Sequence, residues 1–180
     1  VAGAVSFITA LIYLGVYTPM KKVSPVNIAI GAIPGALPPV GGWAAATGNI
    51  AEPGMWLLFG IMFFWQVPHV LSIAWLCKDD YSSAGLKMLP KKDETGYKTL
   101  LWSLVCVFSL FPVTYAMYQF NISGTIFLVL GMLFALGFLA YTIIFGFNRS
   151  KQNAKKMMFA SIAYLPLLWI AVFIDRFISF

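Results

Sequence analysis

The sequence predicts an all-α integral membrane protein, a transmembrane bundle with six spans. Of its 180 residues, 61% are hydrophobic and only 10% are charged, and the mean hydropathy is +0.85, whereas soluble domains carry about 25% charged residues. Several stretches of about 17 to 24 residues are nearly free of charge, which lets a helix cross a hydrocarbon core of roughly 30 Å. The short alternating segments that form membrane β-barrels do not occur in the sequence.

The six expected spans follow one another along the chain. They are Val1–Tyr17, Pro25–Ala46, Gly54–Cys77, Thr99–Tyr118, Thr125–Phe147 and Met157 to about Ile174. The interior of the second span differs from the others because it contains Pro34, Pro38, Pro39, Gly31, Gly35, Gly41 and Gly42. Proline interrupts a helix, and broken backbone at membrane depth survives only where protein or a cavity surrounds it. The second span is therefore expected either to wall a pocket or to be a kinked helix packed through small residues.

The basic residues alternate between the connections. Eleven of the twelve lie in the first, third and fifth connections: Lys21, Lys22, Lys78, Lys87, Lys91, Lys92, Lys98, Arg149, Lys151, Lys155 and Lys156. Because lysine and arginine concentrate on the cytoplasmic side of membrane proteins, these connections are expected in the cytoplasm, with both chain ends outside. The net charge of +6 is then explained by loops, and no nucleic-acid partner is required.

The segment YTPMKK contains the first candidate site. If the helix continues through Pro19, the four-residue spacing places Tyr17 and Lys21 on one face. A lysine beside a hydroxyl group suits binding of a diphosphate. Tyrosine and lysine are also common anchors at the ends of membrane helices, so spacing alone leaves both interpretations open.

The second candidate site lies at the end of the third span. Gln66 and the only histidine, His69, are polar residues inside a membrane-grade segment, where such groups are costly. On a continuous helix, Asp80 would lie on the face of His69, roughly 16 Å further along the axis. This face is expected to bind a long amphiphile with its anionic head near Asp80. The alternative for His69 is a hydrogen bond to a carbonyl group of a neighbouring helix.

Asp79 and Asp80 are candidate magnesium ligands, since Mg²⁺ prefers oxygen ligands and shares them with substrate phosphates. Adjacent residues on a helix diverge by about 100°, so the two carboxylates are expected to share an ion only if the helix has ended. A further acidic group from elsewhere is also expected. The alternative is a solvated pair of loop charges.

Two stretches resemble the protohaem IX farnesyltransferase (haem O synthase) family of UbiA-type intramembrane prenyltransferases. They are YTPMKKVSPVNIAIGAIPGALPPVGGWAAATG and FFWQVPHVLSIAWLCKDDYSSAGLKMLP. In the second stretch WQVPH followed by DYSSAGLKMLP is specific, whereas YxxxK is shared across the wider superfamily. The resemblance implies a nine-helix bundle, of which residues 1–180 supply one domain of six helices and lack the three N-terminal ones.

The same resemblance implies an enzyme that transfers the farnesyl group of farnesyl diphosphate to a vinyl group of haem B. Water adds a hydroxyl group, and the products are haem O, for haem A and cytochrome oxidase cofactor synthesis, and diphosphate. Mg²⁺ bridges the diphosphate to two acidic motifs in that family. Asp79 and Asp80 match the second motif, and Lys21 is the third implied catalytic residue. The implied substrate-binding residues are Tyr17, Lys22, Asn27, Trp65, Gln66, His69, Tyr81 and Lys87.

The first acidic motif is absent from the sequence, so Asp79 and Asp80 are expected to form only half of the magnesium site, and the chain alone is expected to be inactive. The implied partners are the two substrates, the lipid bilayer and haem A synthase. A bacterial inner membrane is favoured over the mitochondrial one. Two alternatives stay open: an intramembrane prenyltransferase with a quinone or aromatic acceptor, and a non-enzymatic membrane transporter or haem-handling protein.

Overall fold

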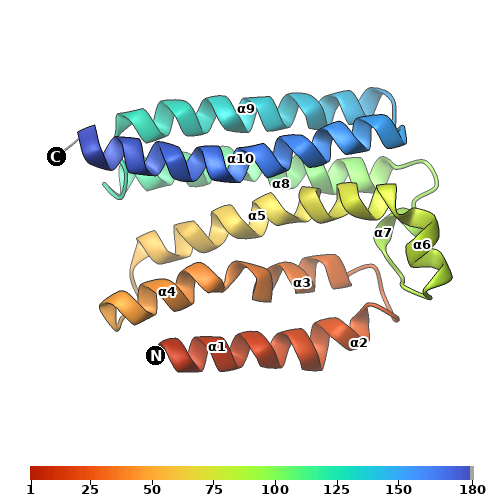
Figure 1. Ribbon diagram of the computed structural model, residues 1–180, viewed down its shortest axis with the longest axis horizontal. Coiled ribbons are helices and arrows are strands. Elements are labelled where there is room, and N and C mark those ends of the chain that lie inside the picture. Colours follow the sequence, from red (N-terminus) through yellow and green to blue (C-terminus); the bar gives the residue numbers. More distant parts are fainter. Residues whose placement is uncertain (179–180) are drawn as a thin grey trace.

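Long helices make up almost all of the computed structural model, which describes residues 1–178 (Figure 1). The elements are α1 (Ala2–Leu11), η1 (Ile12–Tyr17), α2 (Thr18–Met20), α3 (Asn27–Ala36), α4 (Pro38–Thr47), α5 (Pro53–Leu76), α6 (Lys78–Ser83), α7 (Leu89–Lys92), α8 (Tyr97–Gln119), α9 (Thr125–Phe147) and α10 (Lys151–Ile178). The successive elements α1–η1–α2 and α3–α4, together with α5, α8, α9 and α10, give six segments long and apolar enough to cross a membrane. The prediction of a multi-pass, all-α membrane protein with six spans is confirmed.

The spans lie side by side with α5 in the middle (Figure 1). Helix α5 packs against α3 and α4 on one side and against α8 and α10 on the other, while α9 covers α8 and α10. The first span packs mainly on α3 and α4. The connections at residues 21–26, 77–96 and 148–150 gather at one end of the molecule, which we call the basic end.

The second span is broken at Leu37. Helix α3 ends at Ala36 and α4 begins at Pro38, with Leu37 as the residue between them. Pro38 has no N–H to continue the hydrogen bonds of α3, which explains the position of the break. The predicted interruption of this span is confirmed.

The predicted continuous helix from His69 to Asp80 is wrong. Helix α5 ends at Leu76, and Cys77 leaves the helical conformation with φ −97° and ψ 26°. A separate helix, α6, then begins at Lys78 with Asp79 and Asp80 in its first turn. Acidic side chains are stabilised at a helix N-terminus, so the acidic pair favours a new helix start over continuation of α5.

The last span begins earlier than hydropathy indicated. Helix α10 runs from Lys151 to Ile178, so three lysines expected in a loop lie in its first turns: Lys151, Lys155 and Lys156. The Ser150 hydroxyl accepts the Asn153 N–H at 3.2 Å, which is an N-terminal cap of this helix. Hydropathy marks the edge of the bilayer, whereas the cap marks the end of the helix.

Candidate active site

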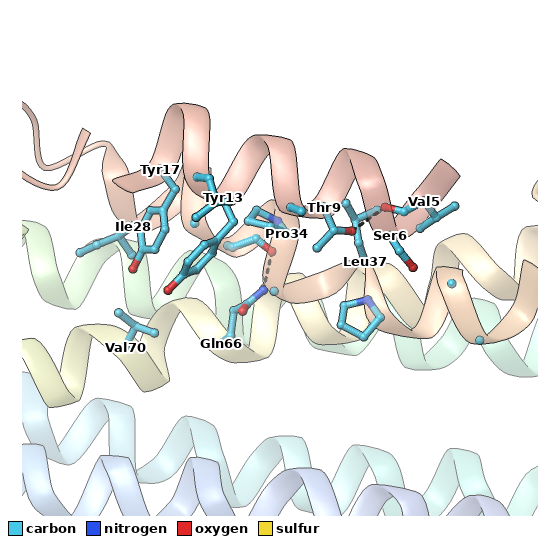
Figure 2. A pocket seen from close by; sticks show the side chains of 18 residues that line it. Val5, Ser6, Thr9, Tyr13, Tyr17, Ile28, Pro34, Leu37, Gln66 and Val70 are labelled. Atoms are coloured by element: carbon cyan, nitrogen blue, oxygen red, sulfur yellow. Dashed lines mark hydrogen bonds between the residues drawn. The ribbon is translucent and has the colours of Figure 1, made fainter. Parts of the chain in front are cut away.

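A cavity of about 850 Å³ lies between the first span and the broken second span (Figure 2). The second span contributes small residues to its wall, among them Gly31, Gly35 and Gly41. Gln66 and Val70 of α5 line the side opposite the first span. The volume falls within the roughly 300–1,000 Å³ of known ligand pockets. Of the two alternatives for the second span, the pocket wall is found, and packing through small residues is found as well, at Gly31 and Gly35.

Tyr13 and Tyr17 line this cavity at the basic end, and Lys21 lies over their rings; we call these three residues the mouth. Both tyrosines line the cavity, and the Lys21 ammonium lies 4.2 Å from the ring centroid of Tyr17 and 5.5 Å from that of Tyr13. The helix continues through Pro19, which is the condition for a shared face of Tyr17 and Lys21. It can continue because the π-helix η1 directly before Pro19 is wider than an α-helix, so the Thr18 N–H donates to the Tyr13 carbonyl five residues back. An ammonium group therefore stands at the head of a mostly apolar cavity.

Tyr13 was not among the predicted site residues. Tyr13, Tyr17 and Lys21 follow one another at intervals of four, so they share one helix face. That repeated spacing is a sequence signal that identifies Tyr13 once the helix is known to continue past Pro19.

Tyr81 and Lys87 reach the same mouth from the segment between α5 and α8. Burial raises the pKa of the Tyr81 phenol above its usual value, and the neighbouring Cys77 thiol and Tyr17 phenol raise that pKa further. Tyr81 therefore stays a hydrogen-bond donor near neutral pH. The Lys87 backbone N–H donates to the Lys21 carbonyl at 2.7 Å, and the Lys87 side chain is exposed.

Asp79 and Asp80 are exposed on α6, immediately before Tyr81 in the chain. A Lys151–Asp79 ion pair at 3.3 Å links α6 to α10, but the two side chains are 67% and 84% exposed. Such a pair is weak because solvent screens it, so the carboxylates are accessible to a cation. Among residues 1–178, no three His, Cys, Asp or Glu side chains come together to hold a metal. The half site for magnesium stays a prediction.

Asp93, which lies in the same connection, is engaged elsewhere. It is buried, and its carboxylate accepts the Thr99 backbone N–H at 2.7 Å in the first turn of α8. Burial by itself raises its pKa, but hydrogen bonds from Thr99, Lys98 and Thr95 outweigh that influence and lower the pKa below its ordinary value. Asp93 is a helix cap and does not face the acidic pair.

Asn27 is completely buried at the start of α3. Its amide nitrogen donates to the Ser24 carbonyl at 2.6 Å and to the Lys87 carbonyl at 3.1 Å. Lys22, by contrast, is exposed beside Lys21. The predicted substrate-binding residue Asn27 thus lies beneath the mouth, bonded to protein backbone.

Gln66 lies on the cavity wall (Figure 2). Its amide nitrogen donates to the Ala32 carbonyl at 2.5 Å, and its amide oxygen lies directly over the Cα of Gly35, where a Cβ atom would collide with it. Gly35 therefore provides the space that lets Gln66 bond α3. Sequence analysis noted Gly35 as a helix breaker and missed this packing role, which depends on a contact between distant residues.

Trp65 and His69 face α10 and do not line the cavity. Trp65 Nε1 donates to the Ser161 carbonyl at 2.7 Å, and His69 Nδ1 lies 2.8 Å from the Ser161 hydroxyl. The two rings stack with centroids 5.1 Å apart. Since that hydroxyl donates to the Met158 carbonyl, it accepts from His69 Nδ1–H. Here these side chains join α5 to α10. The alternative for His69 is correct in placing the bond to a neighbouring helix, but the partner is a hydroxyl group and not the expected carbonyl.

Known proteins that are similar in sequence to this chain are prenyltransferases. The model of the UbiA prenyltransferase family matches residues 1–163. Curated protoheme IX farnesyltransferases from Koribacter versatilis and Opitutus terrae are 40% and 39% identical over 96% and 97% of the chain. A mitochondrial protoheme IX farnesyltransferase of Arabidopsis thaliana is 34% identical over 92% of the chain. The chain spans 58% and 59% of the length of the two bacterial relatives.

The fold is also similar to a solved structure, described as digeranylgeranylglyceryl phosphate synthase in membranes. The TM-score is 0.80 at 19% sequence identity, and the match covers 97% of this chain and 61% of the other. At that identity the similarity establishes the fold alone. The family match over nearly the whole chain shows that the chain belongs to the UbiA prenyltransferase family.

Proposed function

We propose that this chain supplies part of the active site of an enzyme that transfers the farnesyl group of farnesyl diphosphate to a vinyl group of haem B. The observation that carries the proposal is the amphiphilic form of the site: Lys21 and two tyrosines stand at the head of an elongated, mostly apolar cavity. An isoprenoid diphosphate has this form, with an anionic head and a hydrocarbon tail. The relatives' name, protoheme IX farnesyltransferase, supports haem B as the acceptor.

The residues at the mouth suit cleavage of an allylic diphosphate. Negative charge grows on the departing diphosphate, and the Lys21 and Lys87 ammonium groups and the Tyr81 phenol stabilise that charge. The carbocation left behind is sensitive to water, and an apolar cavity excludes water from it. The tyrosine faces of Tyr13 and Tyr17 are suited to a neighbouring cation, as their contact with Lys21 illustrates.

Asp79 and Asp80 fit a role as part of a magnesium site. Their oxygens are hard ligands, they are exposed, and the one ion pair between them and Lys151 is easily displaced. Bound Mg²⁺ supplies positive charge that neutralises the leaving diphosphate. Both lie in the first turn of α6, where adjacent side chains diverge by about 100°. The two carboxylates therefore make an incomplete site, and we expect the 180 residues alone to be inactive.

We infer that the basic end faces the cytoplasm, because its connections carry nearly all of the lysines and arginines. A bacterial cell membrane agrees with the bacterial relatives. The product, a farnesylated haem, requires a membrane enzyme that accepts it, and haem A synthase is the proposed partner.

The test uses a completed protein, in which this chain is joined to the part of the Koribacter versatilis relative that lies outside the match. In membranes with Mg²⁺, farnesyl diphosphate and haem B, we expect the completed protein to form haem O and the chain alone to form none. The Koribacter versatilis relative itself serves as the positive control for the assay. Farnesylation of a hydroxybenzoate in place of haem B would contradict the proposed acceptor.

A further inference from the structure

One buried side chain connects the two lysine-bearing segments of the mouth. Asn27 closes its own turn through a bond from its amide nitrogen to the Ser24 carbonyl at 2.6 Å. The same nitrogen reaches across 60 residues of sequence to the Lys87 carbonyl at 3.1 Å. Asn27 thereby fixes the first connection and the α6–α7 connection with a single amide group.

Both backbone polar groups of Lys87 are hydrogen-bonded. Its carbonyl accepts from Asn27, and its N–H donates to the Lys21 carbonyl at 2.7 Å. Lys21 in turn is held over Tyr17 through its ammonium group. One hydrogen bond therefore joins the backbones of Lys21 and Lys87 directly, and the Asn27 amide holds the Lys87 backbone to the start of α3 with a second.

The burial of Asn27 shows that these bonds are its role. The side chain is 0% exposed, so it does not reach a ligand in the cavity mouth. Its amide oxygen has no hydrogen-bond partner among residues 1–178, which costs free energy. Rotating the amide would not remedy this, since both neighbours of the nitrogen are carbonyls and only an N–H can bond them. An apolar side chain would avoid the cost but would also release Lys87.

We propose that Asn27 is a positioning residue that holds Lys21 and Lys87 at the spacing needed to grip the diphosphate head of the substrate. The inference rests on the proposed function, because it assumes an anionic head at the mouth. Asn27 acts through the two lysines and does not itself touch the substrate. Its sequence-based assignment as a substrate-binding residue is thus refined to an indirect role.

The first arm of the test measures backbone hydrogen exchange in the 180-residue chain in lipid nanodiscs. Asn27→Leu keeps the branched shape of the side chain and removes both the donor and the unpaired oxygen; Asn27→Ala, which removes them without adding bulk, is the second variant. We expect faster exchange at residues 84–88 in both variants and no change in α8 and α9. Thr142→Val is the matched control, because it removes a buried hydroxyl that bonds only its own helix. Unchanged exchange at residues 84–88 would overturn the inference.

The second arm measures steady-state kinetics in the completed protein. We expect Asn27→Leu to raise KM for farnesyl diphosphate about tenfold, equivalent to about 1.4 kcal/mol, with a smaller change in kcat. A purely structural role would lower the amount of folded enzyme and leave KM unchanged. If the completed wild-type protein forms haem O and Asn27→Leu has the same KM, the role of Asn27 is contradicted and the proposed function is not. If the completed wild-type protein forms no haem O, the proposed function is contradicted.

Discussion

Helices α5, α8, α9 and α10 pack around side chains that are completely buried, whereas the first span contacts the protein through one narrow face. The C-terminal core contains Phe127, Phe138, Phe145, Leu110 and Leu168, each at most 1% exposed. In α1, Val5 is the buried residue, and the 850 Å³ cavity lies beside it. The first region is close-packed, and the second is built around open space.

This difference in packing assigns stability mainly to the C-terminal core and ligand binding to the region around the cavity. Packing density determines how strongly a region resists unfolding, and binding sites are drawn from less densely packed regions. The predicted site residues Tyr17 and Gln66 line the cavity and Lys21 lies over the Tyr17 ring, whereas Trp65 and His69 belong to the contact with α10. Substitutions in the C-terminal core should therefore lower the free energy of unfolding, whereas substitutions around the cavity should change the kinetics.

The largest expected effect is on folding. Phe138→Ala should destabilise the protein by about 3–5 kcal/mol, because it leaves a cavity in a close-packed core. Phe7→Ala, at a side chain 67% exposed, should change stability by less than about 0.5 kcal/mol. Reversible unfolding in mixed micelles measures both. Equal effects at the two positions would contradict the contrast between the regions.

Activity should depend on the mouth. Lys21→Met in the completed protein should lower kcat/KM for farnesyl diphosphate about 100-fold, because a charge that stabilises the leaving group is lost. The unfolding midpoint should not change. Lys155→Met is the control, since Lys155 lies over Phe159 on α10, away from the cavity. A comparable loss in both variants would mean that Lys21 contributes only general surface charge.

The shape of the cavity wall should matter to a smaller degree. A Cβ at Gly31 would lie 2.5 Å from the Tyr17 ring, so Gly31→Ala should displace that ring and raise KM about tenfold. Gly15→Ala provides the matched control, because nothing lies within 4 Å of its Cβ position. Initial rates across a range of farnesyl diphosphate concentrations test this, and an unchanged KM in Gly31→Ala would argue against a role for the Tyr17 face.

The smallest expected effect concerns the cap of α8. Because the folded pKa of Asp93 is lowered, its stabilisation is fully present above the unfolded carboxyl pKa of about 3.9 and is lost as pH falls through the lower folded value. Asp93→Asn keeps an oxygen acceptor and removes the charge, so it should cost roughly 0.3–1 kcal/mol at pH 7, and the difference from wild type should shrink toward pH 3. Glu94→Gln, at the exposed neighbour, should show neither effect in the same thermal unfolding series.

The sequence predicted the local parts of the site better than the distant ones. The break in the second span and the shared face of Tyr17 and Lys21 follow from residues within four positions of each other, and both are confirmed. The continuous face from His69 to Asp80 was wrong, because helix starts depend on where the apolar segment ends and charge begins. The contacts of Asn27, Gln66 and His69 reach across 60, 34 and 92 residues, and no pattern in the sequence specifies them.

By itself, the sequence determined an all-α protein with six spans and a lysine-rich end, because a bilayer requires every backbone group to be bonded within its own helix. Tertiary structure alone decided which polar residues meet. It joined Asn27 to Lys87, placed Gln66 over Gly35 and turned His69 toward Ser161. Those choices depend on how helices rotate and approach one another, and that follows from the shapes of side chains far apart in the chain.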